Sequence, residues 1–226
     1  MTISYQRSGG RRPPRDNESL RIDDAAGFTM WRSVGAAAYP ATAIGHFAGT
    51  LAPEVREALT QEGADAVAAG NLSLTPKPDG AVETIVVDAV QASLGANDDP
   101  TGPWLPLVSR VRKLLGDLTA QPRAAIAAQI GQDGTSAQLV HLGTEPLRLD
   151  LSALTVRAVL WRNYSTHGDW RAPNPGLPGE LTAEPGWSLT LPFDHGFTVP
   201  EGASVRVYVT FSAFNGDVSV PVSVEA

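Results

Sequence analysis

The sequence predicts an α+β fold in the first part of the chain and an all-β fold in the second part. Two segments of the first part carry apolar residues at helical spacing, whereas strand candidates follow one another after residue 131 without a helical pattern. The 18 prolines and 22 glycines supply the turns that a strand-rich chain needs. We therefore expect an N-terminal α+β domain over residues 1–130, with antiparallel strands and two helices, and a β-sandwich domain over residues 131–226.

Four strands are expected before the first helix. Residues 2–8 alternate apolar with polar side chains, which is typical of a strand with one buried face, and we expect this strand at an edge of its sheet. Residues 18–23 and 27–35 form two further strand candidates around a turn at "DDAAG". Residues 41–51 form the fourth candidate.

The first helix is expected to begin at Pro53, because proline is favoured just inside a helix start. Apolar residues follow at helical spacing from Val55 to Leu59. Glycine is a weak helix former, so Gly63 should weaken or end this helix, and Gly70 should cap whatever follows.

Residues 71–95 are expected to form two strands around the turn "PKPDG", and a second helix should span residues 103–118. The second helix is well defined because its apolar residues form one stripe that excludes Arg110, Arg112 and Lys113. The stripe consists of Trp104, Leu107, Val108, Val111, Leu114, Leu115 and Leu118.

The second part of the chain shows short strand candidates separated by turns at regular spacing. This pattern is typical of an immunoglobulin-like sandwich, although the cysteines of antibody domains are absent. We expect the boundary between the domains within residues 127–136. The strand candidates are residues 137–142, 147–151, 155–165, 187–193, 204–212 and 218–225.

Composition excludes several classes of function. The chain has no cysteine, which excludes disulfides, thiol nucleophiles and cysteine-ligated metals. It shows no signal peptide and no apolar run long enough to span a membrane, so we expect a cytoplasmic protein without a membrane partner. Residues 1–15 carry four arginines and no acid, while the rest of the chain has a net charge of −11, which disfavours nucleic acid as a partner.

No catalytic or cofactor-binding motif is present, so we expect no enzyme, no cofactor and no metal. One alternative stays open. Two short segments each place a histidine beside an aspartate, His167 with Asp169 and Asp194 with His195, and these four side chains could form an acid–base or metal site if they converge.

The segment "RSGGRRPPR", residues 7–15, is the first candidate surface for a protein partner. Its glycines allow a sharp turn, while Pro13 and Pro14 hold the chain extended, which reduces the entropy lost on docking. Arg7, Arg11 and Arg12 would then meet acidic groups of the partner. A plain solvated hairpin loop is the alternative interpretation.

Residues 161–180 form the second candidate surface. The sequence predicts a long connection here, rich in the residue types that dominate protein interfaces, and Trp161, Trp170 and Arg171 are its candidate binding residues. Burial of both tryptophans against the sandwich is the alternative.

The stretch "ISYQRSGG", residues 3–10, resembles the opening strand and following turn of emfourin-like proteins, which are small bacterial inhibitors of thermolysin-type metalloproteases. The resemblance covers at most residues 3–120, and "RRPPRDNES" departs from the family pattern directly after the glycines. It implies an α+β fold and an inhibitory role. We therefore expect a non-enzymatic protein that binds another protein; the alternatives are the His/Asp site above and an assembly component that self-associates through strand edges.

Overall fold

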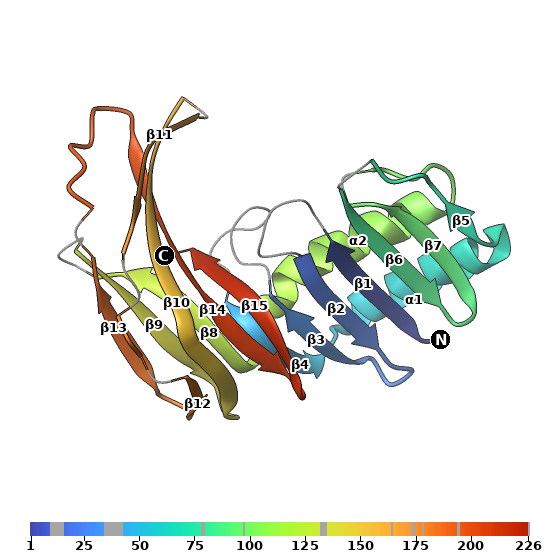
Figure 1. The fold of residues 1–226 in the computed structure, drawn as a ribbon. Coiled ribbons are helices and arrows are strands. Elements are labelled where there is room, and N and C mark those ends of the chain that lie inside the picture. The colour runs from blue at the N-terminus through green and yellow to red at the C-terminus, as the bar shows by residue number, and fades with distance from the viewer. Residues whose placement is uncertain are drawn as a thin grey trace. The chain divides into compact units, whose positions relative to one another are not determined.

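The computed structural model describes residues 1–9, 16–33, 43–77, 80–96, 98–131, 135–163, 165–172, 175–177, 179–193 and 195–225. Within these residues the chain is mostly β, with two α-helices and one short 3-10 helix (Figure 1). The helices are α1 (Pro53–Ala69), α2 (Trp104–Asp117) and the 3-10 helix η1 (Leu118–Ala120). The strands are β1 (Ile3–Gly9), β2 (Asp16–Ile22), β3 (Gly27–Arg32), β4 (Ile44–Thr50), β5 (Leu72–Ser73), β6 (Ala81–Val87), β7 (Val90–Gly95), β8 (Pro122–Ile130), β9 (Ser136–Gly143), β10 (Leu147–Arg162), β11 (Ser165–Arg171), β12 (Glu180–Ala183), β13 (Ser188–Pro192), β14 (Ser204–Asn215) and β15 (Val218–Glu225).

The chain divides into two compact units. The N-terminal unit comprises Met1–Arg32 and His46–Pro122, and the C-terminal unit comprises Ser33–Gly45 and Arg123–Ala226. The α+β character expected for the first part of the chain is present, because both α-helices of the described residues belong to the N-terminal unit. None of the described helices is both long and apolar enough to cross a membrane.

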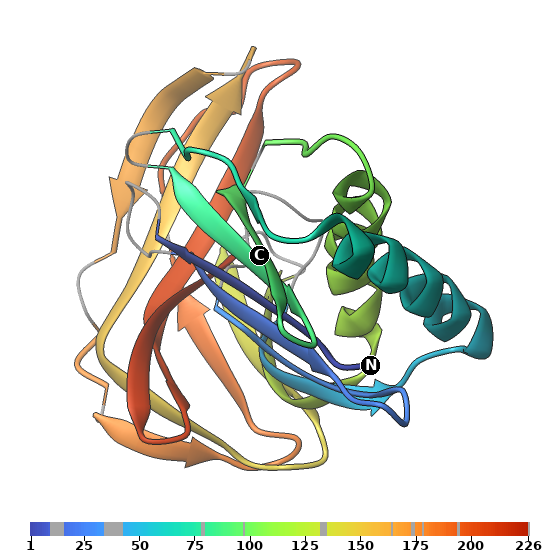
Figure 2. The same ribbon diagram turned by 90° about the vertical axis from the view of Figure 1, so that its right-hand side faces the viewer.

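In the N-terminal unit, the strands follow the order β4-β3-β2-β1-β6-β7-β5, and α1 and α2 cover one face of this sheet (Figure 2). The expected edge position of the first strand is wrong, because β1 pairs with β2 on one side and with β6 on the other. Its inward-facing Ile3 and Tyr5 are buried, while Ser4 and Gln6, which alternate with them, are exposed. Alternating polarity therefore identified the buried face of β1 but not its place in the sheet.

The predicted stripe of α2 is confirmed, since all of its apolar residues are buried. The indole of Trp104 donates a hydrogen bond of 2.9 Å to the carbonyl of Gly70, which joins the start of α2 to the end of α1. Arg110 on α2 forms a two-pronged ion pair with Glu62 on α1, with N–O distances of 2.7 and 2.6 Å. These contacts hold the two helices together over the sheet.

Gly63 does not end α1, since the helix continues to Ala69; the expected cap at Gly70 is confirmed. The physical reason is close packing. A Cβ atom at Gly63 would lie 2.6 Å from the sulfur of Met1 and 3.4 Å from a methyl group of Val87 on the sheet. The missing side chain lets the helix approach the sheet, and this contact offsets the low helix propensity of glycine.

Two hairpin turns show why one turn was predicted and the other was missed. At the predicted "DDAAG" turn, the carboxylate of Asp23 accepts hydrogen bonds from the amides of Ala25 and Gly27 at 2.9 and 2.8 Å. The segment after Gly80 forms two strands instead of the one expected, β6 and β7, joined by a turn at Asp88. Asp88 adopts a positive φ of 51° and accepts a 2.8 Å hydrogen bond from the amide of Thr2, a partner distant in sequence.

The C-terminal unit contains strands of two sheets. Strands β13, β9 and β8 pair in that order, and a separate sheet has the order β11-β10-β14-β15 with β12 also paired to β10. The immunoglobulin-like arrangement and the division at residue 130 stay predictions.

Two local expectations in this unit differ from the structure. The alanine-rich strand β8 was missed because alanine is a poor indicator of strands. The two strands expected at residues 147–151 and 155–165 are one strand, β10, whose pairing with β14 shifts between Asp150 and Thr155.

Gly45 on β4 occupies a position where only glycine fits. Its φ is 127°, a conformation that other residues rarely adopt, and a Cβ atom there would overlap the carbonyl oxygen of Ala124 on β8. Backbone cannot move aside as the end of a flexible side chain can. Gly45 therefore carries both a conformational and a steric constraint.

We predict that Gly45→Ala lowers the free energy of unfolding by about 3 kcal/mol or more, measured by urea denaturation. Gly102→Ala is the matched control, because Gly102 also has a positive φ of 67° but no atom lies within 4 Å of its hypothetical Cβ. This control should lower the free energy of unfolding by about 1 kcal/mol, because only the backbone conformation disfavours alanine there. Equal losses in the two variants would contradict the steric explanation.

His141 on β9 is a buried histidine in the C-terminal unit. It lies opposite Ile126 on β8 and is 4% exposed. Burial lowers the pKa of His141 below its ordinary value, because the charged imidazolium would lose its hydration. The folded protein therefore favours neutral His141.

Because the pKa of His141 is lower in the folded state, the unfolded chain binds a proton first as the pH falls below about 6.5. This group therefore favours the folded state above that pH and opposes it in acid. We predict that His141→Leu reduces the drop in melting temperature between about pH 7.5 and about pH 5. His167→Leu, at an exposed histidine, should retain the wild-type drop, and identical pH profiles for wild type and His141→Leu would refute the prediction.

Candidate functional site

The first candidate surface lies at the end of the β1–β2 hairpin. The two strands pair residue by residue from Ile3↔Ile22 to Gly9↔Asp16, so residues 10–15 connect two ends that are held side by side. Gly9 has a positive φ of 95° at this end. Arg11, Arg12, Pro13 and Pro14 lie outside the described residues.

Arg7, the remaining residue of this surface, belongs to a row of alternating charges across the sheet. Arg32 on β3 pairs with Glu18 on β2, Glu18 pairs with Arg7 on β1, and Arg7 pairs with Glu83 on β6. Residues that lie directly opposite each other on antiparallel strands share a face of the sheet, so basic and acidic side chains alternate along this row. Arg112 on α2 reaches the last member, Glu83.

The row lies on the face of the sheet that the helices cover, and Arg32, Glu18 and Glu83 are buried there. The Arg32–Glu18 pair has an N–O distance of 3.0 Å, with the two side chains 0% and 2% exposed. Glu83 lies 2.8 Å from Arg112 and accepts a hydrogen bond of 3.2 Å from the hydroxyl of Tyr5. Burial raises the pKa of Glu83, and Arg112, Arg7 and Tyr5 act against this rise. Arg7 is therefore part of an internal charge network.

The positions of these charged residues in the sequence indicate the row, although the sequence analysis did not predict it. Each of its four sheet residues lies in phase with the buried apolar residues of its own strand. Arg7 follows Ile3 and Tyr5 at two-residue spacing, and Glu83 precedes Ile85 and Val87 in the same way. A charge on the apolar face of a strand indicates a buried partner of opposite charge.

We predict that Arg32→Met lowers the free energy of unfolding by about 3 kcal/mol, because it leaves Glu18 buried without this partner. The double variant Glu18→Leu/Arg32→Met should recover most of that loss, because it removes both charges and keeps apolar volume. A double-mutant cycle by urea denaturation measures the coupling. Additive losses would show that the two residues do not interact.

The second candidate surface has a different secondary structure from the one predicted. Residues 161–180 were expected to form a long connection, but Trp161 lies near the end of β10, and Trp170 and Arg171 lie on β11, which pairs with β10. The reason is that the chain reverses directly after β10, where Arg162 pairs with Ser165 and Asn163 has a positive φ of 48°.

The structure does not bring these three residues onto one face. Trp170 lies opposite Ala158, and its ring centroid is 6.3 Å from that of Phe193, which follows β13 in the other sheet. Arg171 lies opposite Arg157, one position along, and therefore points to the other face of the strand. Trp161 shares that outer face, where the guanidinium of Arg206 lies 5.0 Å from its ring centroid.

The described members of the alternative His/Asp site each contact other groups. Asp169 forms two hydrogen bonds with Arg157 at 2.9 and 2.8 Å, and this contact lowers the pKa of Asp169. His167 contacts the hydroxyl of Ser165 instead. His195 stacks on Phe197, with ring centroids 4.8 Å apart, and its Nδ1 accepts a 2.9 Å hydrogen bond from the amide of Phe197.

Asp194, the fourth member, lies outside the described residues. Within the part of the chain that the structure describes, no three His, Asp or Glu side chains cluster closely enough to hold a metal ion.

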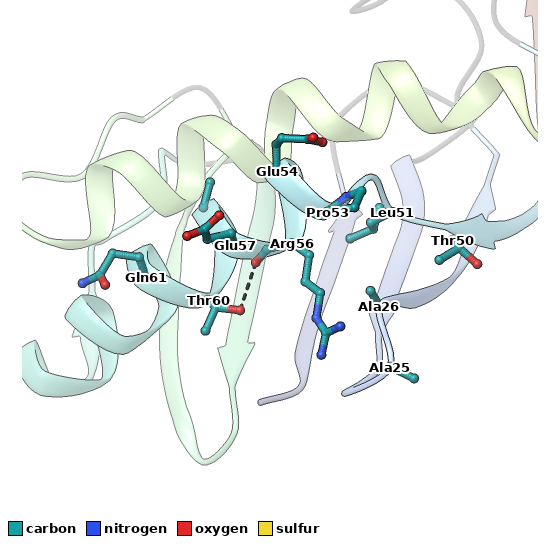
Figure 3. Close-up of a pocket in the computed structure, with 11 residues that line it drawn as sticks. Ala25, Ala26, Thr50, Leu51, Pro53, Glu54, Arg56, Glu57, Thr60 and Gln61 are labelled. Carbon is teal, nitrogen blue, oxygen red and sulfur yellow. Dashed lines mark hydrogen bonds between the residues drawn. The ribbon is translucent and has the colours of Figure 1, made fainter.

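A depression at the start of α1 was not predicted from the sequence (Figure 3). Its volume is about 970 Å³, and Arg56 is its one basic lining residue. The guanidinium of Arg56 donates a 2.9 Å hydrogen bond to the carbonyl of Asp24, while Glu54 and Glu57 add negative charge nearby. The depression thus offers no concentrated charge to a ligand. It is lined by Ala25, Ala26, Thr50, Leu51, Pro53, Glu54, Arg56, Glu57, Ala58, Thr60 and Gln61.

No protein-family model matches this chain, and no curated protein or solved structure matches it either.

Proposed function

We propose that this chain binds another protein through the end of its β1–β2 hairpin, and that it acts as an inhibitor of a protease. The observation that carries the proposal is the pairing of β1 with β2 up to Gly9↔Asp16. Residues 10–15 are thereby held at both ends, and they contain three arginines and two prolines in a chain of net charge −7. A connection with fixed ends loses less entropy on docking than a free peptide of the same sequence.

The sheet supports this role because β1 is a central strand. Its pairing with β6 continues to Gly9↔Ala81, so both neighbours of β1 hold it in place up to the connection. The buried charge row passes through Arg7, two residues before that point. We assign docking to Arg11 and Arg12, whose side chains would contact acidic groups of the partner, and assign Arg7 to the scaffold.

A thermolysin-type metalloprotease is the specific partner that we propose, on the resemblance of residues 3–10 to emfourin-like inhibitors. A constrained loop that enters the cleft of a protease is a common mode of inhibition, and it requires a rigid scaffold below the loop. The β1–β2 hairpin with its two covering helices supplies such a scaffold.

The proposal predicts that Arg11→Glu/Arg12→Glu weakens binding to thermolysin at least about tenfold, because two attractive contacts become repulsive. Inhibition of peptide cleavage by purified protein, with thermolysin as the probe, measures the effect. The melting temperature should stay within about 2 °C of wild type, because exposed charges contribute little to stability.

Arg21→Glu/Lys113→Glu is the matched control, since it makes the same change in net charge at two exposed positions away from the hairpin end. It should inhibit like wild type. If wild type does not inhibit thermolysin at about 100-fold molar excess, the metalloprotease assignment is wrong. If both double variants lose inhibition equally, the inhibition depends on the net charge of the chain and not on the hairpin end.

A further inference from the structure

Strand β11 forms an open edge of its sheet in the C-terminal unit. It pairs with β10, and no other strand of the described residues pairs with its far side. The amide of Ala172 donates a 2.9 Å hydrogen bond to the carbonyl of Val156. Because hydrogen bonding alternates along an antiparallel pair, the backbone groups of Trp170 then face β10, and those of Asp169 and Arg171 face the open edge.

Two other terminal strands of the C-terminal unit carry prolines, whereas β11, like the short strand β12, carries none. Strand β13 contains Pro192, and β15 contains Pro221. Proline removes an amide that an incoming strand would need, and it is a common protection of strand edges. Strand β11 thus keeps every backbone donor along its free side.

The outer face beside this edge is basic, in contrast to the acidic chain as a whole. Arg171 lies opposite Arg157, and Arg206 of β14 belongs to the same face. The only acid of β11, Asp169, is already held by two hydrogen bonds to Arg157. The side chain of Arg171 is 70% exposed, and its Nε lies 4.0 Å from the nearest oxygen of Asp169.

The rear face of β11 is firmly packed, so the edge is supported. A Cβ atom at Gly168 would lie 2.9 Å from the ring of Phe197, which shows that this ring lies directly on the strand. Trp170 contacts Phe193 on the same side. A strand held from behind in this way presents its edge in a defined position, which lowers the entropy cost of adding another strand.

We propose that an extended acidic peptide segment of a partner protein adds to the open edge of β11 as a further strand. Backbone hydrogen bonds to Asp169 and Arg171 would provide affinity, and acidic side chains on the outer face would pair with Arg171. Charge complementarity selects this occupant. A second copy of the same edge would bring another exposed arginine to this basic face and is disfavoured.

Fluorescence anisotropy with a labelled synthetic peptide of alternating glutamate and threonine tests the proposal at low ionic strength, where exposed charges act most strongly. We expect saturable binding with a dissociation constant below about 1 mM. Arg171→Glu should weaken the affinity about tenfold. Arg21→Glu, an equal charge change on an exposed β2 residue, should bind like wild type. Arg7, Arg11 and Arg12 are unchanged in these variants, so the test is independent of the hairpin proposal.

Two further probes separate strand addition from simple charge attraction. The same acidic peptide with alternate backbone nitrogens methylated keeps its charges but cannot pair as a strand, and it should bind at least about tenfold more weakly. A lysine–threonine peptide should not bind. The proposal is overturned if the methylated peptide binds as well as the parent peptide, if Arg171→Glu binds like wild type, or if no binding is found. Light scattering gives the oligomeric state. A dimer in the wild type that is lost in Arg171→Glu would show that a second copy of the chain binds the edge instead.

Discussion

The buried row of alternating charges is the constraint on which the N-terminal unit depends. Arg32, Glu18, Arg7 and Glu83 lie side by side on neighbouring strands, and Arg32, Glu18 and Glu83 are buried. Each charge is tolerated only because a neighbour of opposite sign lies across from it. A slip of one residue between any two of these strands would move a charge to the other face and leave its former partner buried alone. The row therefore fixes the register of the strands that hold the hairpin end.

The spacing of apolar residues predicted the helices and strands that bury only one face. The stripe of the second helix was predicted completely because all of its apolar residues are buried, and the alternation of β1 identified its buried face. It failed where a distant contact decides the structure. Gly63 stays helical because Met1 and Val87 occupy the space of its missing side chain, and the Asp88 turn is supported by Thr2. No local pattern contains these partners.

The candidate surfaces show the same limit. A count of tryptophan, arginine and proline predicted an exposed connection at residues 161–180, yet pairing between β10 and β11 sends Trp170 to one face and Arg171 to the other. Adjacent residues of a strand lie on opposite faces, but the faces of Trp170 and Arg171 relative to Trp161 depend on the shift in pairing between Leu160 and Trp161. The edge of β11 became visible only when the neighbours of each strand were known.

The C-terminal unit is not continuous in sequence, and this affects the order in which the chain can fold during synthesis. Ser33–Gly45 belongs to this unit although it is made before most of the N-terminal unit. Ala43 and Ile44 are buried in the completed protein, but the β8 to β15 strands that belong to their unit emerge from the ribosome much later. Until those strands are made, Ala43 and Ile44 lack the later partners of their unit, and apolar residues exposed at that stage favour aggregation.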